Sequence, residues 1–178
     1  MARTLVEHFQ DMAANNAWSN RRLLAACLHL TDAEFAAERT SFFPSLQQTL
    51  NHIFIVDRYY LADLTGEGRS IVADEIPYPA AADLAAAQAA QDQRLIAFCR
   101  GLNDASLQKI IPINRKDGVD YRETMGAILA HLFLHQIHHR GQAHAMLAGT
   151  KVAPPQLDEF FLAHGAPESL AAQSRFLP

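Results

Sequence analysis

The sequence predicts an all-α protein, a four-helix bundle with a small β-hairpin before the last long helix. Three observations lead to this prediction. Four stretches of mostly about 20 residues are rich in helix-forming residues, glycine and proline punctuate the connections, and a β-prone segment precedes the last stretch. Because 178 residues fit one domain, we expect residues 1–178 to form a single helical-bundle domain.

Helix boundaries are clear in the first half of the chain. Residues 4–29 contain no glycine or proline and predict the first long helix. Thr31 and Ser45 each stand three residues before a glutamate or glutamine, which is the pattern of a capping box. They predict the start of a short helix and of the second long helix, and Gly66 predicts where that second long helix ends.

The middle of the chain predicts the third long helix and the hairpin. Residues 80–100 are rich in alanine and precede Gly101, a typical stop signal. Residues 109–114 and 119–122 are β-prone and flank the turn sequence Lys116-Asp117-Gly118.

The last long helix is expected to begin after Thr124, a suitable N-cap residue, and to end at Gly149. Pro154 and Pro155 prevent its continuation. Residues 157–163 predict one final short helix.

Composition excludes several classes of protein. With 49% apolar and 19% charged residues the chain is typical of a soluble globular protein. A net charge of −4 argues against nucleic-acid binding, and no apolar run is long enough for a membrane-spanning helix. Cys27 and Cys99 form no CxxC pair, and the N-terminus lacks the apolar core of a secretory signal, so we expect reduced thiols and a cytoplasmic location.

Four of the nine histidines fall in one nine-residue stretch, residues 131–139, of the last predicted long helix. They are His131, His135, His138 and His139. His135 and His139 are four residues apart, so they share one helix face and can chelate one transition metal. They also continue a stripe that predicts a core-facing surface: Met125, Ile128, Leu132, His135, His139, Gln142 and Met146. A buried imidazole without a partner is costly, so we expect a metal ion there; the alternative is a pair of core histidines satisfied by hydrogen bonds within the protein.

A metal site in a helical bundle needs a further ligand from a facing helix. The candidates are His8, His29, His52, His131, Asp57 and Asp63. His52 is preferred because it lies midway along the second long helix, at a depth suited to meet the middle of a facing helix. It falls to one side of that helix's apolar stripe, however, so periodicity alone leaves the choice open.

The sequence resembles the DinB family of DinB/YfiT-like metalloenzymes, and the resemblance covers nearly the whole chain in order. The specific element is the run from His131 to His135 and His139, followed by Arg140-Gly141-Gln142. Weaker matching elements are Thr49-Leu50-Asn51-His52-Ile53, Tyr59-Tyr60, Thr65-Gly66, Asp117-Gly118 and the closing segment from Gly149 through Pro154-Pro155 to Leu157-Asp158.

This resemblance implies an up-down-down-up bundle that is often dimeric, so we expect a homodimer. It also implies that the metal is held by one histidine of the second long helix and two of the last one, here His52, His135 and His139. Asp57 stands where relatives often have glutamate, and its role is left open.

The neighbours of the expected ligands have simpler interpretations. His131 lies on the flank of the stripe and could support a ligand, whereas His138 and His144 point away and are expected to be solvated. Arg140 could steer an anionic substrate, but an exposed arginine paired with a surface carboxylate is the favoured interpretation. Gln142 is expected to form a hydrogen bond near the site or a purely structural one, and Gly141 to permit close helix approach or simply to be tolerated.

Three neutral imidazoles leave a coordination position open, which is typical of a catalytic metal. Imidazole suits several divalent metals, and zinc or nickel is expected. The resemblance implies a metal-dependent hydrolase or thiol-dependent transferase that activates water or a low-molecular-weight thiol, such as bacillithiol or mycothiol, in detoxification or stress. The alternative is a non-catalytic metal-binding stress-response protein.

Overall fold

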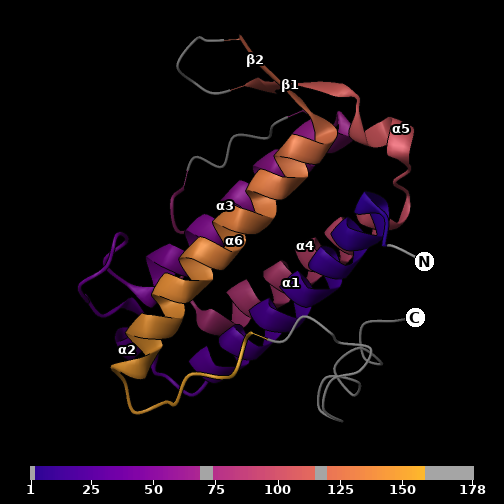
Figure 1. Ribbon diagram of the computed structural model, residues 1–178. Coiled ribbons are helices and arrows are strands. Elements are labelled where there is room, and N and C mark those ends of the chain that lie inside the picture. The colour runs from indigo at the N-terminus through magenta and orange to yellow at the C-terminus, as the bar shows by residue number, and fades with distance from the viewer. Residues whose placement is uncertain (1–2, 69–73, 115–119, 159–178) are drawn as a thin grey trace.

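The computed structural model describes residues 3–68, 74–114 and 120–158. In this part of the chain it shows a mostly helical fold with a two-stranded hairpin before the last long helix, as predicted (Figure 1). The elements are α1 (Leu5–Cys27), α2 (Asp32–Ala36), α3 (Leu46–Thr65), α4 (Ala81–Arg100), α5 (Asp104–Leu107), β1 (Ile110–Asn114), β2 (Asp120–Thr124) and α6 (Met125–Ala148).

The predicted helix boundaries are confirmed by cap geometry. Thr31 forms a reciprocal capping box at the start of α2, and the Ser45 and Thr124 side chains each accept a backbone N–H in the first turn of α3 and α6. Gly66 ends α3 with φ 73°, in the left-handed region that favours glycine. These local hydrogen bonds therefore determine where the helices begin and where α3 ends.

Three segments differ from the prediction or lie wholly or partly outside the described residues. Helix α5 was not predicted, although Asn103 caps it by the same reciprocal pattern with Ser106 that marks α2. The predicted turn at residues 116–118 lies outside the described residues. Of the predicted final helix, residues 159–163 also lie outside them, while Leu157 and Asp158 are not helical.

The core shows how the four long helices run. One apolar cluster joins the beginnings of α1 and α6 to the ends of α3 and α4, with Phe9, Leu129, Leu61 and Leu95 among its members. The second cluster joins the opposite ends of the same helices. Helices α1 and α6 are therefore parallel to each other and antiparallel to α3 and α4, which confirms the up-down-down-up arrangement (Figure 1).

The hairpin covers one end of this bundle. Strands β1 and β2 are antiparallel, with Ile110 opposite Thr124 and Ile113 opposite Tyr121. Ile113 is buried in the first apolar cluster and Tyr121 packs against it, so the hairpin closes the end at which α6 begins. Among the described helices, none has the length and apolarity needed to cross a membrane.

Candidate metal centre

The buried face of α6 is shifted from the stripe that the sequence predicted. Met125, Ile128, Leu132 and Met146 are buried as expected, but the middle of the stripe passes through Gln136, Arg140 and Ala143. An α-helix repeats every 3.6 residues, so its buried face drifts away from a heptad register over several turns. His139 remains buried, 6% exposed, whereas His135 and Gln142 lie half-buried on the flank.

This flank of α6 faces α3, and there three histidines converge. His52 of α3 meets His135 and His139 of α6, and one ligand atom from each lies within 4.8 Å of the others. The Nε2 atoms of His52 and His135 are 3.0 Å apart, and the three ring centroids are separated by 5.0, 4.8 and 4.4 Å. The structure thus brings together the three residues that the family resemblance implied as ligands.

The environment keeps these rings neutral. Burial, and then the neighbouring rings, lower the pKa of His52 to about 4 and that of His135 to about 3. Burial also lowers the pKa of His139, against the hydrogen bond that its Nδ1 donates to Gln142 Oε1, which raises it. At neutral pH the cluster therefore presents imidazole lone pairs, the form in which histidine binds metals.

The donor set fits a divalent transition metal. Four-coordinate zinc with imidazole bonds of 2.0–2.1 Å would space its ligand nitrogens about 3.3 Å apart. In the cluster, two of the nitrogens are 3.0 Å apart and all three ligand atoms lie within 4.8 Å of one another, which is compatible with that spacing. Gln142 Oε1 lies 2.8 Å from His139 Nδ1, so it can accept the Nδ1 proton and leave Nε2 free for a metal. Among the described residues, His135 Nδ1 is buried without a hydrogen-bond partner. The alternative that His135 and His139 are core histidines fully satisfied by hydrogen bonds within the protein is therefore inadequate.

The other candidate ligands lie outside the cluster. His131 is exposed and contacts Tyr60 edge-on at 5.3 Å, with its centroid 6.4 Å from His135. His138 is exposed as expected and its Nε2 lies 3.0 Å from Gln142 Nε2. The expectation for His144 is wrong, because its half-buried ring hydrogen-bonds the carbonyl of Pro155 at 2.9 Å.

Gly141 has a simpler role than close packing. It is exposed, and a Cβ built there would meet nothing within 4 Å. The helix therefore tolerates glycine at this position rather than needing it for close approach to a neighbouring helix.

Two phenylalanines of the loop between α2 and α3 lie against the cluster. Phe43 is 4.4 Å from His52 and 5.5 Å from His139 between ring centroids. Phe42 packs edge-on against Phe43 at 4.9 Å and lies 6.3 Å from His139. Two adjacent aromatic residues in a short loop were the available signal, but only the fold shows which side chains they meet.

The interpretation of Arg140 as an exposed arginine is wrong. Its side chain is only 5% exposed, and Nη1 donates to Asn16, to Asn20 at 3.0 Å and to Gln136 at 3.0 Å. The drift of the buried face turns position 140 toward α1, so the arginine enters the bundle between the two apolar clusters. Burial lowers its pKa to about 10, against the opposing effect of Asp92 and Asp57, so it stays charged at neutral pH.

Asp57 belongs to the same interior region and not to the histidine cluster. It accepts hydrogen bonds from Gln88 at 3.0 Å and from Gln136. Burial, and then the charge of Asp92, raise its pKa to about 8. Its Oδ1 has no partner among the described residues, which agrees with a protonated carboxyl at neutral pH.

Asp92 completes this region from α4. Asn16 and Asn20 donate to its carboxylate at 3.0–3.3 Å, and Gln88 donates at 3.0 Å. Burial raises the pKa of Asp92 to about 6. We call the whole group the buried polar layer, and its members are Asn16, Asn20, Asp57, Gln88, Asp92, Gln136 and Arg140.

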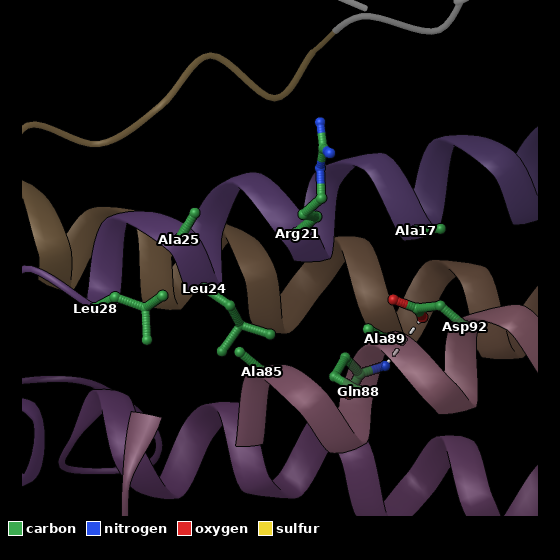
Figure 2. A pocket seen from close by; sticks show the side chains of 9 residues that line it. All are labelled: Ala17, Arg21, Leu24, Ala25, Leu28, Ala85, Gln88, Ala89 and Asp92. Carbon is green, nitrogen blue, oxygen red and sulfur yellow. Dashed lines mark hydrogen bonds between the residues drawn. The ribbon is translucent and has the colours of Figure 1, made fainter. Parts of the chain in front are cut away.

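Figure 2 shows Gln88 and Asp92 at one end of a small cavity of about 130 Å³ between α1 and α4. Its walls are mostly apolar, and Arg21 points away from it. The polar layer was not predicted from the sequence, although Asn16 with Asn20 and Gln88 with Asp92 are pairs spaced four residues apart on their helices.

The fold and this site define a class: a helical-bundle protein with a three-histidine group that could hold a metal ion. Comparison with known proteins agrees with this description. The chain belongs to the DinB family, whose profile matches residues 1–173.

A solved structure supports the fold. The crystal structure of a DinB-like protein from Bacillus cereus ATCC 10987 superposes with a TM-score of 0.67 at 20% identity, covering 84% of this chain and 95% of the other. No curated protein matches the sequence. At this identity the likeness concerns the fold, and the chemistry has to be argued from the residues.

Proposed function

We propose that this protein is a divalent-metal-dependent enzyme whose site, formed by His52, His135 and His139, activates a small thiol or a water molecule for transfer or hydrolysis. The observation that carries the proposal is the convergence of three neutral imidazoles from two antiparallel helices, with ligand atoms within 4.8 Å of one another. Three protein ligands leave room for an exchangeable one, as in catalytic zinc sites.

Different residues of the chain would bind the metal, orient its ligands and shield the site. His52, His135 and His139 bind the ion, with zinc or nickel expected from imidazole ligands. Gln142 orients His139 by accepting its Nδ1 proton, and Phe43 shields one side of the cluster from water. When bound, the divalent ion supplies Lewis acidity, which lowers the pKa of a bound water or thiol and provides the nucleophile at neutral pH.

A metal-loading and activity screen tests this function. The chain is loaded with zinc or nickel and assayed with low-molecular-weight thiols and electrophilic or hydrolysable substrates. We expect turnover that needs the metal and disappears in His135→Ala. Turnover that is equal in the metal-free protein would contradict the assignment.

The second candidate is a non-catalytic metal-binding protein of the stress response. The observation in its favour is that His52 and His139 join α3 to α6, so a bound ion would also crosslink two helices of the bundle. In that case the ion would be coordinatively filled, and its removal would cost folding stability. Water exchange at a paramagnetic ion such as Ni²⁺, measured by relaxation, separates the two candidates.

The assembly and partners form part of the same proposal. We propose a cytoplasmic homodimer with a small-molecule substrate, and no nucleic-acid partner because the net charge is −4. Sedimentation of the purified chain tests the dimer.

A further inference from the structure

An aromatic side chain stands exposed beside the metal centre. Phe42 is 75% exposed, yet its ring lies 6.3 Å from His139 and 4.9 Å from Phe43. Scattered exposed apolar residues are normal on protein surfaces. This one differs because the aromatic pair it forms with Phe43 continues directly onto two rings of the histidine cluster.

The loop that carries this pair is held in place at its base. The backbone N–H of Arg39 donates to the carbonyl of Pro44 at 2.7 Å, which closes the loop around residues 40–43. The Arg39 guanidinium donates to the carbonyls of Glu34 and Ala37, both at 2.7 Å, and so ties the loop to α2. Ser45 then caps α3. The two phenylalanines are therefore presented in a preformed position.

A ligand bound at the open metal position must reach it from solvent. Phe42 borders the cluster on a solvent-exposed side, so a substituent of such a ligand can lie against its ring. An apolar or aromatic substituent would gain buried area and ring contacts there, whereas a short hydroxylated one would gain little.

We propose that Phe42 and Phe43 form a selectivity wall that favours thiols carrying an apolar or aromatic group close to the sulfur. This inference rests on the proposed function, because it needs an exchangeable position on the metal. Binding forms one metal–sulfur bond, displaces one water molecule and releases the thiol proton to the buffer.

Cobalt-substituted protein provides a direct measurement. The Co²⁺-loaded chain is titrated with benzyl mercaptan and, separately, with 2-mercaptoethanol, and the thiolate-to-cobalt charge-transfer absorption gives each dissociation constant. We expect benzyl mercaptan to bind about tenfold more tightly than 2-mercaptoethanol, after allowing for the thiol pKa values, as one or two ring contacts would give.

Variants test whether Phe42 causes the preference for benzyl mercaptan over 2-mercaptoethanol. Phe42→Ala should remove most of it while cobalt stoichiometry and the affinity for 2-mercaptoethanol stay unchanged, and Phe42→Tyr should keep it. Leu134→Ala is the matched control, because Leu134 is also a large exposed apolar residue, 66% exposed, on α6. It should leave the preference as in the parent chain.

The possible results distinguish a failure of the selectivity wall from a failure of thiol binding at the metal. An equal preference in Phe42→Ala and the parent chain would overturn the selectivity wall while leaving the open metal site intact. Absence of charge-transfer absorption with both thiols, in protein that holds cobalt, would overturn the thiol function and the inference with it. A change from dimer to monomer in Phe42→Ala, with the preference retained, would assign the exposed ring to contact between two copies of the chain and would also overturn the proposal.

Discussion

Consecutive residues of α6 serve two different sites, and the contrast explains what each site needs. His135 and His139 turn toward α3 and join the histidine cluster, whereas Gln136 and Arg140 turn into the buried polar layer. In the polar layer, amide and guanidinium donors meet carboxylate and amide acceptors. In the cluster, three neutral rings direct nitrogen atoms at one another.

The difference lies in the balance of donors and acceptors. The polar layer is satisfied almost entirely by its own members, so it needs no ligand and contributes to the specificity of packing. The cluster brings imidazole nitrogens together without a matching set of donors. Its natural complement is a cation from outside the chain.

Removing a ligand ring should weaken metal binding strongly. One of three ligands accounts for roughly a third of the binding free energy, so His52→Ala, His135→Ala and His139→Ala should each weaken affinity on the order of 1,000-fold. Elemental analysis of the purified variants measures the loss. His138→Ala is the matched control and should retain about one ion per chain. Unchanged metal content in the three ligand variants would remove the cluster from consideration as a metal site.

Removing the buried guanidinium should damage the fold and spare the metal. Arg140→Met leaves the side-chain oxygens of Asn16, Asn20 and Gln136 without their donor and removes the charge that favours the Asp92 carboxylate, which should together cost about 3 kcal/mol of unfolding free energy. Chemical denaturation measures this cost, with the exposed Arg100→Met as a control that should stay within about 0.5 kcal/mol. The double variant Arg140→Met, Asp92→Asn should recover part of the loss. A single variant as stable as the parent chain would show that the polar layer does not depend on this charge pair.

Disturbing the orientation of His139 should weaken the site without emptying it. Gln142→Leu removes the acceptor of the Nδ1 proton, and we expect metal affinity to fall about 10- to 100-fold. A competition titration with a chelator measures the change. Gln142→Glu keeps an acceptor at the same place and should hold metal at least as well as the parent chain. Equal affinity in Gln142→Leu would mean that the packing of α6 alone orients the ring.

In the metal-free protein, the buried polar layer and the histidine cluster should change the free energy of unfolding in opposite directions as pH changes. Because burial raises the pKa of Asp57 to about 8, the folded chain keeps a proton that the unfolded chain releases above about pH 4. The contribution of Asp57 to the free energy of unfolding should therefore fall by about 1–2 kcal/mol as pH rises from 6.5 to 8, and level off at higher pH. Asp92, with its pKa raised to about 6, acts in the same direction at lower pH.

The histidines act in the opposite direction, from about one pH unit above their ordinary pKa of 6.5 downward. The lowered pKa values of His52 and His135 mean that the unfolded chain binds protons that the folded chain does not, so these rings reduce stability as pH falls. Above about pH 7.5 the unfolded histidines are already neutral, so denaturation curves from about pH 7.5 to 8.5 report mainly on Asp57. Asp57→Asn should flatten the slope in that window, and the exposed Asp83→Asn should not. A slope that persists in Asp57→Asn would assign it to another group.

The features that depend on residues close together in the chain could be predicted from the sequence. Thr31, Ser45, Thr124 and Gly66 mark helix ends because their hydrogen bonds or backbone angles involve only the neighbouring turn. The pairing of His135 with His139 follows from helix geometry alone. The up-down-down-up bundle and the choice of His52 came from the resemblance to the DinB family, and periodicity had left His52 open.

The tertiary structure decided everything that joins distant segments. His52 and His135 are 83 residues apart, and they meet only because α3 packs against α6 in this register. The same packing places Phe43 on the ligand rings. The burial of Arg140 was missed because a shift of one position around α6, set by the drift of a 3.6-residue repeat, decides whether a side chain faces solvent or the bundle interior.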